Sequence, residues 1–353
     1  MPIIPINDES IARAAAVIAG GGLAAFPTET VYGLGGDVFN PLSLAKIFEV
    51  KGRPRFDPLI VHIAVFETLE TVADLSLLGV QARKNVAALT QRFWPGPLTL
   101  ILPKQKTIPD LATSGLSTVA VRLPDHDAAR RLIALSTGAV AAPSANPFGY
   151  LSPTRAEHVA AMLGEKIEII LDGGAARFGL ESTVLDMSGE KPRVLRPGAV
   201  PKEAIEAFVG FADLGEVAVG SEIANNSPAS PGMLKSHYAP RVPLVTHNGE
   251  LLPEVDGSAC HGVACRNAAM LFFDGASRDK WLSVSLTGQK PAVVAVLSET
   301  GDILEAAARL FETLHELDRP GVRRIYAQLA PEENLGVAIN DRLRRAENTH
   351  GKE

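Results

Sequence analysis

Short apolar runs alternate with segments of helical periodicity along the first part of the chain. Apolar residues recur at helical spacing from Ile11 to Ile18, and Asn7 or Asp8 can cap the helix that this pattern predicts. An apolar strand follows at 23–26. The same reasoning predicts helices at 42–50 and 80–93, and strands at 58–63, 98–102, 119–123, 139–142, 167–171, 182–185 and 194–198. Strands that alternate with helices predict an α/β fold.

The pattern changes after residue 212. Residues 217–231 are rich in Ser, Asn, Ala and Pro and have almost no large apolar side chains, which is typical of a linker. A new α/β pattern begins at Val242, with helices predicted at 303–317 and 335–346 and a strand at 323–327. We therefore expect three parts, namely a first domain at 1–212, a linker at 213–243 and a smaller α/β domain at 244–348.

The composition fits a soluble globular protein. Hydrophobic residues make up 46% and charged residues 21% of the 353 residues. No apolar run approaches the ~20 residues of a membrane span, and the N-terminus lacks a signal-peptide pattern. The two cysteines, Cys260 and Cys265, fit a reducing, cytoplasmic setting. A net charge of −6 gives no global reason to expect nucleic-acid binding.

A basic loop follows the predicted helix at 42–50. Lys51, Arg53 and Arg55 lie within five residues and repel one another unless an anion lies between them. Arginine offers planar bidentate donors to phosphate, and lysine offers a compact charge. A lone run of charges is usually a solvated surface loop. This loop, however, leads directly into the apolar strand at 58–63 and so lies at the edge of the core, which favours a polyphosphate site.

Hydroxyl and amide side chains gather after two other strands. Two hydroxyls and a carboxylate at 27–30 (PTET) can bind an ammonium, a hydroxyl or a metal, and a capped turn is an equal alternative. The turn at 143–146 (PSAN) can contact phosphate, ribose or base edges. Ser152 is expected both to cap the helix that begins near Arg155 and to contact a ligand.

Three charged side chains are set in otherwise apolar strands, namely His62, Arg122 and Arg196. Each alone is compatible with an internal salt bridge, but a buried arginine is costly unless it is paired. Three such residues together favour a site for an anion. The chain has no Walker loop, no dinucleotide-binding fingerprint and no nucleophile elbow, so a nucleotide would be bound by a less familiar arrangement.

Nine short motifs occur in order between residues 27 and 198. They are PTETVYGLG at 27–35, KGRP at 51–54, PLIVH at 58–62, PGPLT at 95–99, AVRLP at 120–124, PSAN at 143–146, SPT at 152–154, ESTV at 181–184 and LRPG at 195–198. Together they resemble the threonylcarbamoyl-AMP synthase family, whose catalytic module is the YrdC-like domain. Residues 231–240 resemble the linker of its longer, two-domain members. The resemblance implies a twisted, open mixed sheet with flanking helices, joined to a smaller Rossmann-like α/β domain.

The resemblance also implies an activity. The family condenses L-threonine, bicarbonate and ATP into threonylcarbamoyl-AMP and releases pyrophosphate. Mg²⁺ accompanies the ATP, and no metal ligand from the protein is expected. A transferase complex then places the threonylcarbamoyl group on the tRNA adenosine beside the anticodon, and direct tRNA binding is left open. No membrane is involved.

Matching positions imply the site residues. Threonine would be held by Thr30, His62, Arg122, Ala142 and Ser182, with Arg122 on its carboxylate and Ala142 acting through its backbone. ATP would be surrounded by Lys51, Arg53, Asp57, Thr118, Ser144, Asn146, Ser152, Arg196 and Tyr238. Lys51 and Arg53 would be catalytic, and Tyr238 of the linker would fold over the nucleotide. Many members carry Asn where this chain has Asp57, and a carboxylate there repels phosphates unless Mg²⁺ or Arg53 intervenes.

Two other functions remain compatible with the residues themselves. The basic loop is compatible with an RNA-binding module, although an aromatic content of 5% disfavours base stacking. A different ATP-dependent carbamoyl-transfer enzyme is the second alternative, but the two cysteines exclude the zinc-finger array that such proteins carry.

Overall fold

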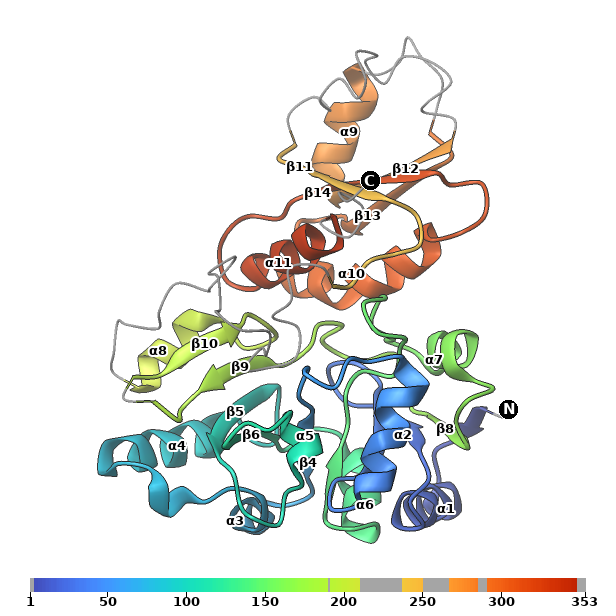
Figure 1. The fold of residues 1–353 in the computed structure, drawn as a ribbon. Helices are drawn as coiled ribbons and strands as arrows, with labels where there is room; N and C mark the ends of the chain where they lie inside the picture. Colours follow the sequence, from blue (N-terminus) through green and yellow to red (C-terminus); the bar gives the residue numbers. More distant parts are fainter. Residues whose placement is uncertain (1–2, 190, 210–236, 250–266, 285–290, 348–353) are drawn as a thin grey trace. The chain divides into compact units, whose positions relative to one another are not determined.

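The computed structural model describes residues 3–189, 191–209, 237–249, 267–284 and 291–347 (Figure 1). Two compact units are formed by the chain. The first comprises Met1–Phe148 and Ser152–Leu234, and the second comprises Gly149–Leu151 and Lys235–Glu353. The predicted Ser/Asn-rich linker segment at 217–231 and the two cysteines lie outside the described residues.

The first unit is built on one mixed sheet of ten strands in the order β1-β8-β2-β3-β7-β4-β6-β5-β9-β10. Its strands are β1 (Ile3–Pro5), β2 (Ala24–Phe26), β3 (Gly33–Asp37), β4 (Ile60–Ile63), β5 (Leu98–Pro103), β6 (Thr118–Arg122), β7 (Ala139–Ala141), β8 (Ile169–Asp172), β9 (Thr183–Asp186) and β10 (Arg193–Arg196). Its helices are α1 (Asp8–Ala19), α2 (Pro41–Lys51), α3 (Leu69–Val72), α4 (Val80–Phe93), α5 (Asp110–Thr113), α6 (Asp127–Leu135), α7 (Ala156–Leu163) and α8 (Lys202–Val209). The predicted mixed sheet with flanking helices is confirmed.

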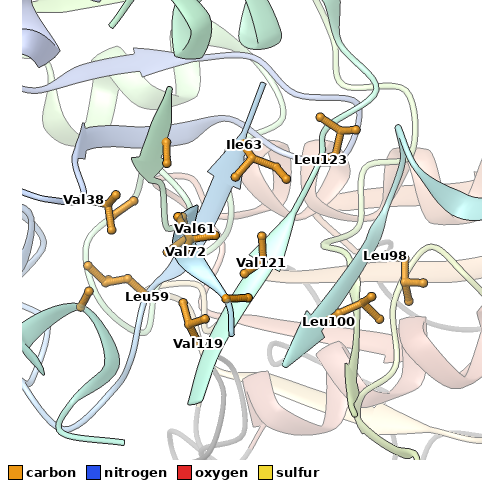
Figure 2. Packing of buried hydrophobic residues seen from close by; sticks show 14 of the residues in the cluster. Val38, Leu59, Val61, Ile63, Val72, Leu98, Leu100, Val119, Val121 and Leu123 are labelled. Carbon is orange, nitrogen blue, oxygen red and sulfur yellow. The ribbon is translucent and has the colours of Figure 1, made fainter. Parts of the chain in front are cut away.

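Side chains in the middle of this sheet alternate between its faces. Val61 and Ile63 of β4 and Val119 and Val121 of β6 belong to the main apolar core (Figure 2). Because successive strand residues point to opposite faces, the residues between them point away from this core. His62 and Arg122 are the residues of these two strands with ionisable side chains, and they are register partners. Both point away from the core, so these polar groups share one face of the sheet.

Helix α1 begins where the sequence indicates. The Asn7 side chain accepts a hydrogen bond from the Ser10 backbone N–H at 2.8 Å, and the Ser10 hydroxyl closes the capping box at the Asn7 N–H. The expected cap of α7 by Ser152 is wrong. Arg155 is the N-cap residue and makes no side-chain cap, whereas the Ser152 hydroxyl donates to Glu181 Oε1 at 2.5 Å.

Strand β3 was not expected from the sequence, because three of its five residues are glycines. The glycines allow side chains of the neighbouring strands to pack closely against β3. A Cβ on Gly35 would lie 2.6 Å from a ring carbon of Phe26 in the paired strand β2 and 3.1 Å from Val140. Glycine is thus required by the approach of neighbouring side chains, an interaction over long sequence distance that local propensity does not report.

The second unit contains a four-stranded parallel sheet in the order β11-β14-β12-β13. The strands are β11 (Leu244–His247), β12 (Ala268–Asp274), β13 (Val293–Ser298) and β14 (Arg324–Gln328), and the helices are α9 (Gly275–Val284), α10 (Ile303–Leu317) and α11 (Leu335–Glu347). Tyr150 joins this unit through a bridge to Ala239 and a hydrogen bond to Asp318. The predicted smaller α/β domain with a parallel sheet is confirmed.

Gly198 gives a testable constraint on the first unit. A Cβ there would meet the carbonyl oxygen of Glu181 at 2.4 Å and backbone atoms of Ser182 and Thr183 at 2.5 Å. Backbone atoms cannot rotate away, so Gly198→Ala should destabilise the protein by about 1–3 kcal/mol in denaturant unfolding. Gly79→Ala is the matched control, because nothing lies within 4 Å of its Cβ. Equal stability of the two variants would contradict this packing.

Candidate active site

The polar face of the sheet places His62 beside Arg122. Strands β4 and β6 are parallel, and these two residues are register partners. Both side chains are buried, at 3% exposure. Burial, together with the charge of Arg122, lowers the pKa of His62 from 6.5 to about 3, so its imidazole is neutral at pH 7. His62 can therefore hold a substrate by hydrogen bonding and not by charge.

Arg122 is tied to two loops. Its Nη1 donates to Thr30 Oγ1 at 2.8 Å and its Nε donates to the Gly96 carbonyl at 3.2 Å. Its Nη2 lies 2.6 Å from Glu29 Oε1. A buried guanidinium needs such partners. N–H groups on both terminal nitrogens remain for a ligand carboxylate, which a guanidinium can bind in two-pronged fashion.

Ser182 connects two further strands. Its hydroxyl lies 2.7 Å from Thr99 Oγ1 of β5, and Arg196 Nη2 donates to the same hydroxyl at 3.1 Å and to the Ser182 carbonyl at 2.9 Å. Thr99 and Arg196 are both buried. Thr99 was not among the predicted site residues. Thr99 is the last residue of the PGPLT motif at 95–99, and this motif was the sequence signal for it.

The predicted basic loop is only partly buried, because Lys51 and Arg53 are buried whereas Arg55 is exposed. Lys51 Nζ donates to the Ser144 carbonyl at 2.6 Å and to the Asn146 carbonyl at 2.5 Å. This lysine therefore ties the end of α2 to the predicted turn at 143–146. Burial, with the nearby charge of Arg53, lowers the pKa of Lys51 well below its usual range. An anion beside it would favour the charged ammonium.

Arg53 meets Asp57 in an ion pair of 2.9 Å, and its Nε donates to the Asp57 carbonyl at 3.0 Å. Asp57 is fully buried, and burial raises the pKa of its carboxyl while Arg53, Lys51 and Arg196 act in the opposite direction. Arg53 thus counters the negative charge of Asp57. From the sequence, a carboxylate near phosphates was expected to need either Mg²⁺ or Arg53 beside it.

Strand β7 and its following turn bring the remaining residues of this unit together. The Ala142 N–H donates to the Ile60 carbonyl at 3.0 Å, and Ser144 forms a bridge to Gly33. The Asn146 and Ser152 side chains are buried, whereas Ser144 and Thr118, the first residue of β6, are half-buried. The predicted residues of the first unit therefore lie on strand ends and turns of one sheet.

Two further buried groups lie near these residues, namely Glu29, the carboxylate of the 27–30 segment, and Tyr32, to which no role was assigned from the sequence. Glu29 is 3% exposed and is the ion-pair partner of Arg122. The Tyr32 hydroxyl donates to the Gly174 carbonyl at 2.7 Å, and burial raises its pKa to about 12. Both belong to the 27–35 motif, so the motif itself was the signal.

Tyr238 belongs to the second unit. Its ring is buried, 5.7 Å from the ring of Phe311 and 4.8 Å from the guanidinium carbon of Arg342. Its φ of 64° is unusual for a residue with a side chain. The predicted role of Tyr238 over the nucleotide stays a prediction.

In the part of the chain that the structure describes, no three His, Cys, Asp or Glu side chains come together as a metal cage requires. None of the described helices combines the length and apolarity needed to cross a membrane.

Both parts of the chain match known protein families. Residues 16–198 match the Sua5/YciO/YrdC family, described as "Telomere recombination", and residues 200–347 match "Threonylcarbamoyl-AMP synthase, C-terminal domain". The fold and the site define an α/β enzyme of this family. More particularly, the chain belongs to the two-domain threonylcarbamoyl-AMP synthases.

Relatives cover nearly the whole chain. The threonylcarbamoyl-AMP synthase of Pyrococcus abyssi is 41% identical over 97% of this chain and 95% of its own length. That of Bacillus subtilis is 41% identical over 96% of this chain and 93% of its own length. The crystal structure of P. abyssi Sua5 complexed with L-threonine matches with a TM-score of 0.82 and 37% identity, over 99% of this chain and 98% of that one.

The low pKa of His62 predicts how stability depends on pH. Between about pH 3 and 6.5 the unfolded imidazole is protonated while the folded one is neutral, so stability falls as the pH drops through this window. Between pH 7 and pH 5, the loss should be smaller in His62→Gln by about 2 kcal/mol. Urea unfolding of both proteins at the two pH values measures the difference. Parallel pH profiles would contradict the buried neutral imidazole.

Proposed function

We propose that this chain makes threonylcarbamoyl-AMP from L-threonine, bicarbonate and ATP, as a nucleotidyltransferase. The proposal rests above all on the buried Arg122, which keeps N–H groups for a carboxylate while Glu29 and Thr30 fix its position. The name of the relatives and the threonine bound to P. abyssi Sua5 support it. The nearly complete coverage of these relatives and the two family matches also support it.

The threonine half of the site is proposed to lie on the polar face of β4, β6 and β9. Arg122 binds the carboxylate, and Ser182 offers a hydroxyl that Arg196 and Thr99 hold in place. Neutral His62 and Thr30 complete this half by hydrogen bonding. The Ala142 N–H is engaged with Ile60, so its carbonyl is the group left for a substrate.

The ATP half is proposed to lie between the basic loop and the turn at 143–146. Lys51 already holds two carbonyls of this turn, and a phosphate oxygen is a suitable third acceptor for its ammonium. Arg53 and Arg196 add guanidinium donors, and Asn146 and Ser152 add short polar groups. Asp57, Thr118, Ser144 and Tyr238 remain proposed neighbours of ATP.

The reaction needs little covalent chemistry from the protein. The neutral amine of threonine attacks the carbon of bicarbonate, and loss of water leaves a carbamate. A carbamate oxygen then attacks the α-phosphorus of ATP and pyrophosphate leaves. Lys51 and Arg53 stabilise the negative charge that grows on the phosphates, which is the usual route in phosphoryl transfer.

Mg²⁺ is proposed to arrive with ATP. Since the described residues offer no cage of three ligands, the phosphates would supply most of its coordination, and Asp57 is the buried carboxylate beside the cations. The ion would neutralise phosphate charge. Delivery of the product to a tRNA-modifying transferase and a cytoplasmic location are part of the same proposal.

Pyrophosphate release tests the function. The full chain, incubated with ATP and Mg²⁺, should release pyrophosphate only when both threonine and bicarbonate are present. Release that requires carbamoyl phosphate instead would favour the alternative carbamoyl-transfer enzyme. Absence of release, together with tight and salt-sensitive RNA binding, would favour the RNA-binding alternative.

Lys51→Met tests the proposed role of the lysine. The variant keeps the apolar stem and removes the ammonium, so pyrophosphate release should fall at least ~100-fold, the usual cost of losing one transition-state donor. Threonine binding should persist, because Arg122 and Ser182 hold it. The melting temperature shows whether the turn at 143–146 survives without its donor. Normal turnover would exclude a catalytic role for Lys51.

A further inference from the structure

The loop after β2 contains a chain of hydroxyl groups whose direction is fixed. Thr28 Oγ1 lies 2.7 Å from the Val31 carbonyl oxygen, and a carbonyl can only accept. The single Thr28 proton is therefore donated to Val31. Thr28 Oγ1 also lies 2.9 Å from Thr30 Oγ1, and in that contact Thr28 must accept. The backbone N–H groups of Thr30 and Val31 point to the same oxygen at the longer distances of 3.2 and 3.3 Å, so the hydroxyl contact is the closest of the three. The Thr30 proton is thus donated to Thr28.

The second neighbour of Thr30 restricts it further. Arg122 Nη1 donates to Thr30 Oγ1 at 2.8 Å, and a guanidinium has no acceptor. With its proton given to Thr28 and one lone pair taken by Arg122, the Thr30 hydroxyl has one lone pair left. It can accept from a ligand but has no proton for one. The ligand group at Thr30 must therefore be a donor.

Glu29 gives a second, independent indication of a donor. Its side chain is buried, and Oε1 lies 2.6 Å from Arg122 Nη2. Oε2 is buried and has no hydrogen-bond partner among the residues that the structure describes. A buried carboxylate oxygen without a donor is costly, and a cationic donor satisfies it best. Glu29 and Thr30 are adjacent acceptors beside the donor Arg122.

An α-amino acid carries a matching pair of groups on one carbon, a cationic ammonium donor and a carboxylate acceptor. We propose that Thr30 and Glu29 bind the α-ammonium of the substrate before it is deprotonated, and that Thr28 is the positioning residue which makes Thr30 an acceptor. This inference rests on the proposed function and adds which end of threonine this loop recognises. The side-chain hydroxyl of threonine is the competing donor.

Three ligands separate these possibilities on the full chain. They are L-threonine, the 3-hydroxybutanoate of matching configuration, which has a hydrogen in place of the amine, and L-2-aminobutyrate, which lacks the side-chain hydroxyl. Affinities are measured by competition calorimetry for the wild type, Thr28→Val and Thr28→Ser. Valine preserves the volume and frees the Thr30 proton, but it also removes the hydroxyl that bonds the backbone of Thr30 and Val31, and serine restores all of these contacts. Melting temperatures are compared alongside.

Thr28→Val should weaken the binding of L-threonine and L-2-aminobutyrate at least tenfold and that of 3-hydroxybutanoate less than twofold, and Thr28→Ser should bind all three within threefold of the wild type. Equal losses for all ligands would indicate a general collapse of the loop and overturn the inference. Loss confined to the two ligands that carry the side-chain hydroxyl would also overturn it. A wild type that does not bind L-threonine would refute the proposed function as well.

Glu29→Gln supplies a second test on the same ligands. The amide keeps the shape but loses the charge that the ammonium requires, so the preference for L-threonine over 3-hydroxybutanoate should fall at least tenfold. In turnover, the loss should appear in KM for threonine, with KM for ATP within twofold of the wild type. An unchanged preference would overturn the role of Glu29.

Discussion

The burial of four cationic side chains is the constraint on which the first unit depends. Lys51, Arg53, Arg122 and Arg196 are each at most 7% exposed, and water cannot solvate them. Each must then meet protein oxygens in fixed geometry. The oxygens come from turns and strand ends, such as the carbonyls of Ser144 and Ser182. Satisfying these charges therefore also fixes the loops that surround the site.

The sheet order explains how distant motifs meet. Strand β6 lies between β4 and β5, and β9 lies beside β5, so motifs from four places in the sequence share one polar face. The opposite face is filled by aliphatic side chains such as Val61 and Val121 (Figure 2). A rigid core beneath positions the polar groups above, which suits catalysis by placement and electrostatics.

Much of this architecture could be predicted from local patterns. The strand at 119–123 with its buried arginine and the helix at 303–317 follow directly from hydrophobic periodicity. Strand β3 could not be predicted, because glycine is required there by the close approach of Phe26 and Val140 from neighbouring strands. Long-range contacts of this kind leave no local signature.

The candidate site shows the same difference between what local sequence predicts and what long-range contacts decide. That Arg122 needs a partner follows from burial, but its choice of Glu29 and Thr30 depends on the fold. For Ser152 the local sequence suggests a wrong partner. Its sequence position suggests a helix cap, but the fold turns its hydroxyl to Glu181 instead. Sequence therefore identifies residues that carry chemistry, and tertiary structure decides their partners.

The proposed role of Arg122 is tested most directly by measuring how strongly variants of this residue bind threonine. The double variant Arg122→Met/Glu29→Gln removes the guanidinium without leaving a buried unpaired carboxylate, and Glu29→Gln alone is its control. Calorimetry with L-threonine and with ATP should show that the double variant binds threonine at least ~30-fold more weakly than the control, the cost of losing a buried charge partner. ATP affinity should stay within threefold. Unchanged threonine affinity, or an equal loss for both ligands, would contradict the assignment of this buried arginine to the amino-acid carboxylate.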